Sequence, residues 1–353
     1  MMNRIYHILG IQIKRCVTMI VLAMAFLCSC STDVDLYTSP TDATIVYGVL
    51  DVAADTNFIK ITRAFPGCND DGFDANQIMT IADSSNYPYK LDACLVEYSG
   101  PLHGNCTPTG REIRLDTVTI HNKVNGMFYG PDQLMYFTKS RLYPNKKDKQ
   151  YQYELRICKD DTITSKIGLL GSENFKVNTN MVYFSVTPSS QVRKIEMTLD
   201  EHEAVYQVDM QFNYKEVVPG HDTVYQNVQW TLGTFTKNDF YYDNGIYYVK
   251  YSERTLFDLL ENTIEVSVLH VDRFFDSFLI TVTAYGMDAY CYSQMSIPSG
   301  GLNHIAMDYN YTNIHGGYGV LSSKYKLVKN VAISPRAQAD LLSKPWGFKQ
   351  FGY

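Results

Sequence analysis

Hydrophobic and polar residues alternate in short runs along most of the chain from residue 44 onward. Val, Ile, Tyr, Phe and Thr fill these runs, and Gly, Asn, Asp and Pro separate one run from the next. Alternation of this kind is typical of strands that bury one face of a sheet. The strands predicted from it cover residues 44–50, 58–63, 93–98, 151–157, 181–187, 194–199, 205–214, 221–235, 263–271 and 277–285. The pattern therefore predicts a mainly β protein.

Local turn and cap signals refine this pattern. Asn125-Gly126 and Asn244-Gly245 each separate two strand-like runs, and Asn-Gly favours a two-residue hairpin because both of its residues tolerate positive φ. Few helices are expected. The three predicted helices are one capped by Ser252 that ends near Asn262, one over residues 288–295, and one from Ser334-Pro335 through Leu342.

The order of these elements predicts two domains after an N-terminal targeting segment. The first is an Ig/transthyretin-like β-sandwich, interrupted by a long loop, and the second is a β-rich domain with a few short helices. The predicted boundaries are 1–29 for a lipoprotein signal peptide, 30–43 for an acylated tether, 44–158 for the N-terminal β-sandwich, 159–180 for a linker and 181–353 for the C-terminal β-rich domain.

The N-terminus has the three parts of a bacterial lipoprotein signal. Arg4, Lys14 and Arg15 precede an apolar run over residues 17–27, which is too short for a membrane-spanning helix of about 20 residues. The following LCSC resembles a lipobox, which implies that Cys30 is acylated on its thiol and on its new amine. Each buried CH₂ of those chains contributes about 0.8 kcal/mol, so Cys30 is expected to anchor the protein in outer-membrane lipid. The alternative is an ordinary secretory cut beside an incidental cysteine.

A short acidic stretch follows the predicted anchor. Ser31, Thr32, Asp33 and Asp35 resemble the surface-export signal of lipoproteins in gut-type Gram-negative bacteria. The resemblance implies an outer-membrane protein that faces the cell surface. An acidic, solvated tether is the alternative interpretation.

Charge excludes one class of partner. The chain has 31 Lys and Arg against 37 Asp and Glu, a net charge of −6. Removal of the predicted signal peptide takes away three basic residues and lowers the charge to −9. Nucleic acid is not expected as a partner, because no basic field is present.

The tyrosine content suggests a candidate binding surface. Of 28 tyrosines, five surround the second hairpin signal: Tyr241, Tyr242, Tyr247, Tyr248 and Tyr251. Exposed rings there could stack on a sugar or pack against a peptide. Cross-strand aromatic pairs also stabilise hairpins by about 0.2–1 kcal/mol each without any ligand. Both interpretations stay open.

Catalytic motifs are absent from the sequence. It contains no HExxH, Walker A or GxSxG motif, and no cofactor is expected. His202 lies between Glu201 and Glu203, but neighbours on a strand point to opposite faces. The chain is therefore predicted not to be an enzyme. A hydrolase whose acids, such as Glu201 and Asp209, meet only in the folded protein is the less favoured alternative.

Two further groups of residues are weaker candidates. Asp70, Asp71 and Asp74 gather around Gly72 as in a calcium loop, although the EF-hand spacing is missing and an acidic surface turn is the favoured alternative. Cys94 and Cys106 flank a short Pro- and Gly-containing stretch and could form a disulfide in an oxidising compartment. Free thiols buried in a β core are the alternative.

Two late segments carry a family resemblance. They are Asp288-Ala289-Tyr290-Cys291-Tyr292 and the run from Tyr311 to Val320 (YTNIHGGYGV). Together with the opening strand IVYGVL, they resemble lipoproteins of unknown function from gut-type Gram-negative bacteria, which have an N-terminal sandwich and a C-terminal β-rich domain. Val320-Leu321 and the insertion around Cys68 depart from the family pattern, and no catalytic residues carry over.

The resemblance implies association with a TonB-dependent transporter of the starch-utilisation type. The resulting expectation is a non-enzymatic cell-surface lipoprotein, accessory to the capture of a nutrient (a glycan or peptide). A fimbria-like adhesin or pilus subunit is the rival structural hypothesis.

Overall fold

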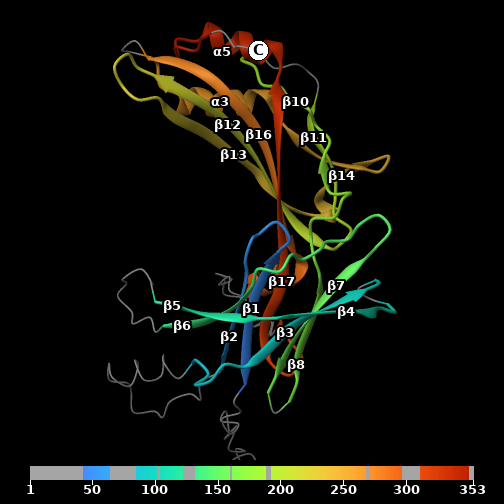
Figure 1. The fold of residues 1–353 in the computed structure, drawn as a ribbon. Helices are drawn as coiled ribbons and strands as arrows, with labels where there is room; N and C mark the ends of the chain where they lie inside the picture. The colour runs from blue at the N-terminus through green and yellow to red at the C-terminus, as the bar shows by residue number, and fades with distance from the viewer. Residues whose placement is uncertain are drawn as a thin grey trace, which may run out of the picture. The chain divides into compact units, whose positions relative to one another are not determined.

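A computed structural model describes residues 43–63, 85–101, 104–121, 132–159, 161–187, 192–267, 271–295 and 311–349. Strands dominate these residues, and only three short α-helices accompany them, which confirms the mainly β prediction (Figure 1). No helix in the described ranges is long and apolar enough to cross a membrane. The following predicted features lie outside the described residues: the signal peptide, Cys30, Ser31, Thr32, Asp33, Asp35, the Asp70, Asp71 and Asp74 group, and the Asn125-Gly126 hairpin.

Three sheets contain the described strands. The largest has the order β13 (Val224–Thr236), β12 (Ala204–Val217), β16 (Asp272–Gly286), β17 (Tyr318–Ile333), β1 (Thr44–Asp51), β2 (Asn57–Arg63), β6 (Gln133–Thr138) and β5 (Asp116–Ile120), with β10 (Met181–Val182) also paired to β17. The second has the order β14 (Tyr241–Asp243), β15 (Ile246–Tyr251), β11 (Arg193–Thr198) and β9 (Lys176–Val177). The third has the order β4 (Thr107–Arg114), β3 (Asp92–Ser99), β7 (Tyr151–Cys158) and β8 (Ile163–Gly168).

The 16-residue strand β17 joins the two halves of the largest sheet. Its first part pairs in parallel with β1, and its second part pairs antiparallel with β16, with Lys324 at the change of partner. Figure 1 shows this strand running from the lower group of strands into the upper one. Gly319 permits the pairing with β1, because a Cβ at its φ of 103° would lie 2.1 Å from the carbonyl oxygen of Val46.

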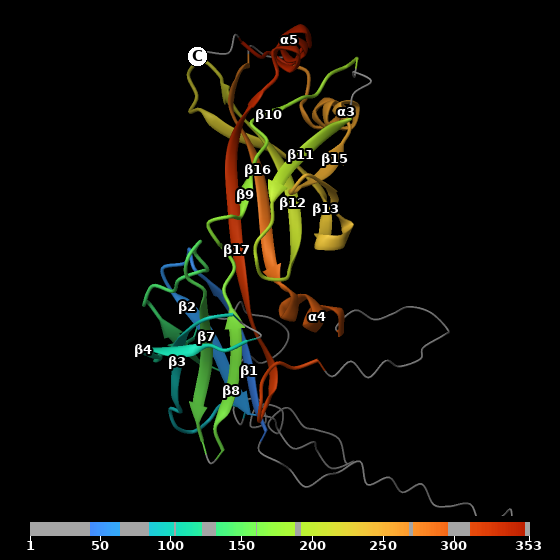
Figure 2. The same cartoon turned by 90° about the vertical axis from the view of Figure 1, so that its right-hand side faces the viewer.

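Two hydrophobic cores lie along this strand. The first includes Leu95, Leu155 and Leu321, so a strand from late in the chain helps to fill a core built mainly by early strands. The second is enclosed between the sheet of β11 and β15 and the strands β12 and β16 (Figure 2). Leu169 belongs to the first core and its neighbour Leu170 to the second. The described residues from 43 onward belong to one compact unit.

The structure corrects the predicted linker over residues 159–180. Strand β8 lies inside that range and pairs with β7, burying Ile163, Ser165 and Ile167 on one face. Its short alternating run contains serine and lysine, so its composition resembles a loop although its period is that of a strand. Strand β9 also falls within the range and pairs with β11.

Two predicted strands are wrong or shorter than expected. Residues 264–267 of the predicted 263–271 strand are not a strand, because Ile264 closes the helix α3 (Glu253–Thr263) and donates its backbone N–H to Leu260. Of the predicted 181–187 strand, only β10 at its start forms. The backbone then turns to Asp340, whose carboxylate accepts from Ser185 Oγ at 2.6 Å and from Val186 N at 3.1 Å.

The predicted helices and the second hairpin are confirmed. Helix α3 is capped by Ser252, α4 covers Met287–Met295, and α5 covers Pro335–Ser343 with Ser334 as its cap. Asn244 and Gly245 have φ values of 47° and 86° between β14 and β15. These signals were reliable because a cap or a tight turn is decided by a few neighbouring residues.

Candidate functional site

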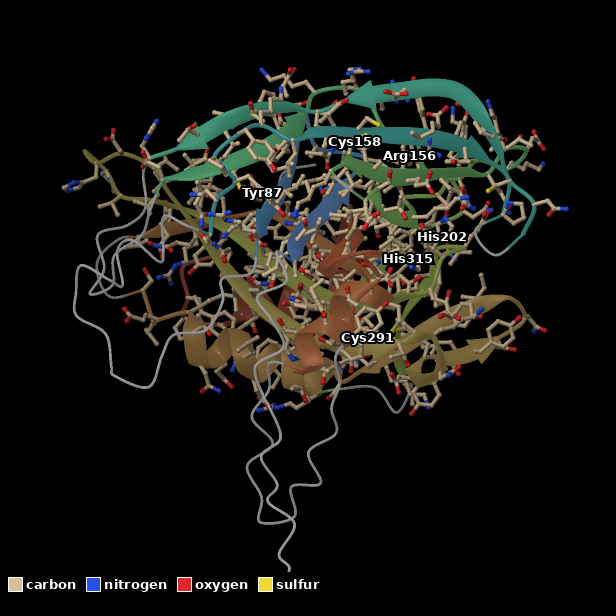
Figure 3. The ribbon with its side chains drawn as sticks, turned by 90° about the horizontal axis from the view of Figure 1, so that it is seen from below. Tyr87, Arg156, Cys158, His202, Cys291 and His315 are labelled. Atoms are coloured by element: carbon tan, nitrogen blue, oxygen red, sulfur yellow. The ribbon has the colours of Figure 1, made fainter. Side chains whose placement is uncertain are left out.

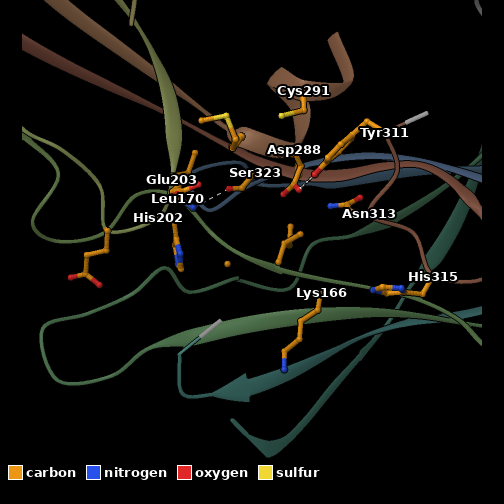
Figure 4. Close-up of a pocket in the computed structure, with 16 residues that line it drawn as sticks. Lys166, Leu170, His202, Glu203, Asp288, Cys291, Tyr311, Asn313, His315 and Ser323 are labelled. Carbon is orange, nitrogen blue, oxygen red and sulfur yellow. Dashed lines mark hydrogen bonds between the residues drawn. The ribbon is translucent and has the colours of Figure 1, made fainter. Parts of the chain in front are cut away.

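A cavity of about 760 Å³ lies where the chain passes from one core to the other. Its walls come from β8, the turn between β11 and β12, the start of α4, and the segment that leads into β17 (Figure 4). Ile167 of the first core and Leu170 of the second both line it. The cavity is therefore assembled from four segments that are distant in sequence.

One wall is held by a contact between α4 and the segment before β17. The Tyr311 hydroxyl donates a hydrogen bond to Asp288 in the first turn of α4. Burial, together with this acidic neighbour, holds the pKa of Tyr311 well above its usual value, so the phenol stays protonated and keeps donating. The backbone N–H of Ala289 donates to Ser322 Oγ at 3.2 Å, which fixes the start of the helix against β17.

The segment over residues 311–315 is fixed by strand-like contacts. The Asn313 amide donates to the Leu321 carbonyl at 2.7 Å and accepts from the Leu321 N–H at 2.9 Å. The backbones of His315 and Thr164 exchange two hydrogen bonds of 3.1 and 2.8 Å. The imidazole of His315 lies at the cavity (Figure 4). Backbone hydrogen bonds, rather than contacts of the imidazole, fix the position of this residue.

The opposite wall is the turn over residues 200–203. Asp200 fixes it by accepting backbone hydrogen bonds from Gly171 at 2.8 Å, Ser172 at 2.9 Å and His202 at 3.1 Å. A second cavity, of about 210 Å³, lies against the same turn and shares Glu201, His202 and Glu203 with the large one. This turn therefore lies between the large cavity and the small one and contributes residues to both.

The cavity carries hydrogen-bonding groups without a recognisable metal site. Figures 3 and 4 place His202, His315 and Cys291 on separate elements. Across the described ranges, no three His, Cys, Asp or Glu side chains converge closely enough to hold a metal ion. The wall instead combines imidazole, hydroxyl and carboxylate groups with the apolar atoms of Ile167, Leu170 and Met287. Such a surface suits a small ligand that has both polar edges and C–H faces.

The acidic pair considered for a hydrolase is not brought together at this site. Glu201 lines the cavity and accepts hydrogen bonds from the amides of Asn145 at 3.2 Å and Asn174 at 3.0 Å. Asp209 lies within β12, where Thr231 and Gln207 donate to it at 2.5 and 2.9 Å. Each of the two carboxylates therefore accepts hydrogen bonds from a different set of residues.

The tyrosine cluster divides between the two faces of its sheet. Tyr241 stacks on Tyr248 with ring centroids 5.3 Å apart, and Tyr242 packs on Tyr247 at 4.9 Å. Tyr251 is buried, and its hydroxyl accepts from the Tyr183 N–H at 3.0 Å. The five rings therefore do not form one platform.

Lysines cover the exposed stack of this hairpin. The ammonium of Lys250 lies 3.6 Å from the ring centroid of Tyr241, and that of Lys194 lies 4.1 Å from the ring centroid of Tyr248. A sugar would have to displace these cations to stack on the rings. The geometry favours the structural interpretation of Tyr241 and Tyr248 over ligand contact.

The predicted disulfide between Cys94 and Cys106 is contradicted. Both cysteines are free, and the register of β3 with β4 places them at opposite ends of the hairpin. Cys94 is opposite Arg114, whereas Cys106 adjoins the Ser99–Thr107 pair, five residues further along β3. At about 3.3 Å per residue this separation far exceeds the reach of a disulfide. Burial and the nearby Glu112 raise the pKa of the Cys94 thiol to about 11.

Sequence reasoning did not assign Asp288, Tyr311, Asn313 and His315 to a site, yet all four line the cavity. They fall in the two segments that carry the family resemblance, and that dense run of polar and aromatic residues was the available signal. No protein-family model and no curated protein matches the chain.

Proposed function

We propose that the protein is a non-enzymatic, lipid-anchored cell-surface protein that binds a glycan or short peptide in the cavity between its two cores. The cavity is the observation that carries the proposal. Its volume of about 760 Å³ lies within the range of about 300–1,000 Å³ that small-ligand sites occupy. The lipobox around Cys30 and the acidic Ser31–Asp35 stretch support the anchor and the surface location. The resemblance described above supports a TonB-dependent transporter as the partner.

The polar groups of the cavity support binding rather than turnover. Asp288 and Tyr311 are engaged with each other, and the Asn313 amide is engaged with the β17 backbone. These contacts pre-organise the wall, which lowers the ordering cost when a ligand binds. Glycans and peptides offer the matching hydrogen-bonding edges and apolar faces.

We also propose that the early strands form the Ig/transthyretin-like sandwich expected from the sequence, completed by the first part of β17. Two layers support this proposal: the sheet β4-β3-β7-β8 and the strands β17-β1-β2-β6-β5. The first hydrophobic core draws its residues from both layers.

A library of glycans and peptides, screened by calorimetry and scored for turnover in the same samples, tests the binding proposal. Cys291→Phe places a bulky ring in the cavity from α4 and is expected to lower affinity at least tenfold. Cys158→Phe is the matched control, because Cys158 is exposed on a strand end outside the cavity (Figure 3). Equal affinity of the two variants would exclude the cavity as the binding site, and product formation would exclude the non-enzymatic assignment.

The location and the partner need tests of their own. Mass spectrometry of the mature N-terminal peptide is expected to find three acyl chains on Cys30. Protease added to intact cells is expected to cleave the protein, and protection until the envelope is broken would exclude surface exposure. Purification in mild detergent is expected to bring a TonB-dependent transporter with it, and recovery of the lipoprotein alone would count against that partner.

A further inference from the structure

A lysine amine and a cysteine thiol touch on the outer face of the four-stranded sheet. Lys166 Nζ of β8 donates to Cys106 Sγ at 2.5 Å, although 60 residues separate them in sequence. Cys106 immediately precedes β4, and β4 and β8 are the two edges of that sheet. In Figure 4 the amine end of Lys166 points away from His202 and Asp288. Lys166 is also one of the residues that line the large cavity, so the contact lies at the edge of that cavity, away from its Asp288 and His202 walls.

The turn before β4 is built to bring Cys106 to this place. Gly100 has a φ of 126°, and a Cβ there would lie 2.7 Å from the Asn105 oxygen and 2.9 Å from the Cys106 Cα. The Gly100 N–H donates to Gln150 O at 3.1 Å, and Gln152 Nε2 donates to Gly100 O at 2.7 Å. Glycine thus allows the backbone just after β3 and the backbone just before β4 to lie close together, with Cys106 at that point.

The lysine is positioned by an aromatic ring that is itself fixed. Lys166 Nζ lies 4.1 Å from the ring centroid of Tyr98. The Tyr98 hydroxyl donates to Glu154 at 2.8 Å and accepts from Arg156 at 2.5 Å. The amine is therefore held between the Tyr98 ring and the Cys106 sulfur, rather than moving freely in solvent.

We propose that Cys106 and Lys166 are the two ends of an oxidative crosslink in which one oxygen atom bridges the sulfur and the nitrogen. The Lys166 nitrogen and the Cys106 sulfur are in direct contact, so a single oxygen atom can bridge them without any movement of the strands. Partly accessible cysteines beside cationic groups are the ones that oxidants reach. Cys106 is half-buried and meets this description.

The chemistry balances with dioxygen as the oxidant. The lysine ammonium releases one proton to water. The thiol S–H bond and one N–H bond of the resulting amine then break, and S–O and O–N bonds form. The second oxygen atom leaves as water with the two hydrogens. Sulfur and nitrogen each give up two electrons, and dioxygen accepts all four. Two equivalents of a dithiol return the four electrons and restore the thiol, the amine and a second water.

The crosslink would join the two edges of the sheet and remove the positive charge of Lys166. Lys166 and the two residues that follow it in β8, Ile167 and Gly168, all line the large cavity. Oxidation would thus fasten one wall of that cavity to the turn that carries Cys106. This consequence does not depend on which ligand the cavity takes.

Peptide mass spectrometry of the full chain, purified in air or without oxygen, tests the proposal. The air-exposed protein is expected to yield a linked pair of peptides containing Cys106 and Lys166. Its mass should equal their sum plus one oxygen and minus two hydrogens. Dithiothreitol should abolish the link, and heavy-isotope dioxygen should place its label in the bridge.

Three variants make the assignment specific. Cys106→Ser and Lys166→Arg are each expected to abolish the linked species, whereas Cys158→Ser is expected to retain it. Complete alkylation of Cys106 in the air-exposed wild-type protein would overturn the proposal. So would a link that lacks the oxygen mass, a disulfide at Cys106, or sulfonic acid at Cys106 beside an unmodified Lys166. The wild-type measurement needs no variant to fold.

Discussion

The imidazole of His202 lies directly against Gly168 of β8, in the space that a side chain at position 168 would need. A Cβ built on Gly168 would fall 2.3 Å from Cε1 and 2.4 Å from Nε2 of His202. The turn between β11 and β12 therefore approaches β8 closely only because residue 168 is a glycine. This contact sets the position of one wall of the large cavity.

Gly168→Ala is expected to push the His202 ring toward the cavity and to lower the free energy of unfolding by about 1–2 kcal/mol. Adding His202→Ala removes the clash, so the double variant should be more stable than the sum of the single effects predicts. Urea unfolding of the four proteins in the cycle measures the coupling. Additive effects would show that the contact does not position the turn.

The parts of this site that the sequence predicted are the local ones. The helix cap at Ser252 and the Asn244-Gly245 turn depend on residues within a few positions of each other. The cavity depends instead on β8, a turn near residue 202, the start of α4 and residues 311–315, which only long-range strand pairing brings together. A single sequence carries periodicity and turn signals, but not that pairing.

Gly319→Ala is expected to lower the free energy of unfolding by about 3 kcal/mol or more. The alanine would combine a strained positive φ with a contact against the Val46 carbonyl. Gly110→Ala is the matched control, because Gly110 also has a positive φ, of 84°, but a Cβ there meets no atom within 4 Å. Gly110→Ala should lower the free energy of unfolding by only about 1 kcal/mol. Equal losses for the two variants in chemical denaturation would contradict the close approach of β17 to β1.

Arg111→Met is expected to cost about 3 kcal/mol, because it leaves the Glu97 carboxylate buried without its guanidinium partner. Burial of Glu97 opposes ionisation, but hydrogen bonds from Arg111, Tyr153 and Thr109 outweigh it and hold the carboxyl pKa below its usual value. This stabilisation is present above the unfolded pKa and is lost as pH falls through the folded pKa.

The difference in the free energy of unfolding between the wild-type protein and Arg111→Met should therefore become smaller as pH is lowered and Glu97 takes up a proton. Arg114→Met is the control, since the Arg114–Asp92 pair is exposed at 74% and 60%, and its loss should cost at most about 1 kcal/mol. Urea midpoints measured at neutral and acidic pH give both comparisons. A deficit that does not change with pH would contradict the role assigned to Glu97.

The protein is expected to lose stability as pH rises above about 10. Burial raises the pKa of Tyr251 from 10.0 to about 12, so the unfolded chain releases this proton before the folded protein does. Between these two values the folded state binds more protons, and the free energy of unfolding falls with increasing pH. Tyr251→Phe should flatten the decline by up to about 1.4 kcal/mol per pH unit. Thermal unfolding across this range measures the slope, and an unchanged slope in the variant would contradict the shift.

The composition of the strands also explains two errors in the sequence-based fold. Residues 263–271 contain alternating Ile, Val and Val, but α3 extends to Thr263 and Ile264 serves the helix end and the core. Strand β8 has only two isoleucines, so its composition predicts a linker. In both places tertiary packing decided between patterns that local propensity left nearly equal.

The pairing of β17 with β1 has a consequence for biosynthesis. The partners Ile45 and Tyr318 are joined late, because a nascent chain exposes the edge of β1 until residues near 318 have been made. Pairings of such high sequence separation form slowly, and an open strand edge is a template for aggregation in the meantime. The largest sheet therefore cannot close until translation is nearly complete. The chain must be kept from association until its final strand is available.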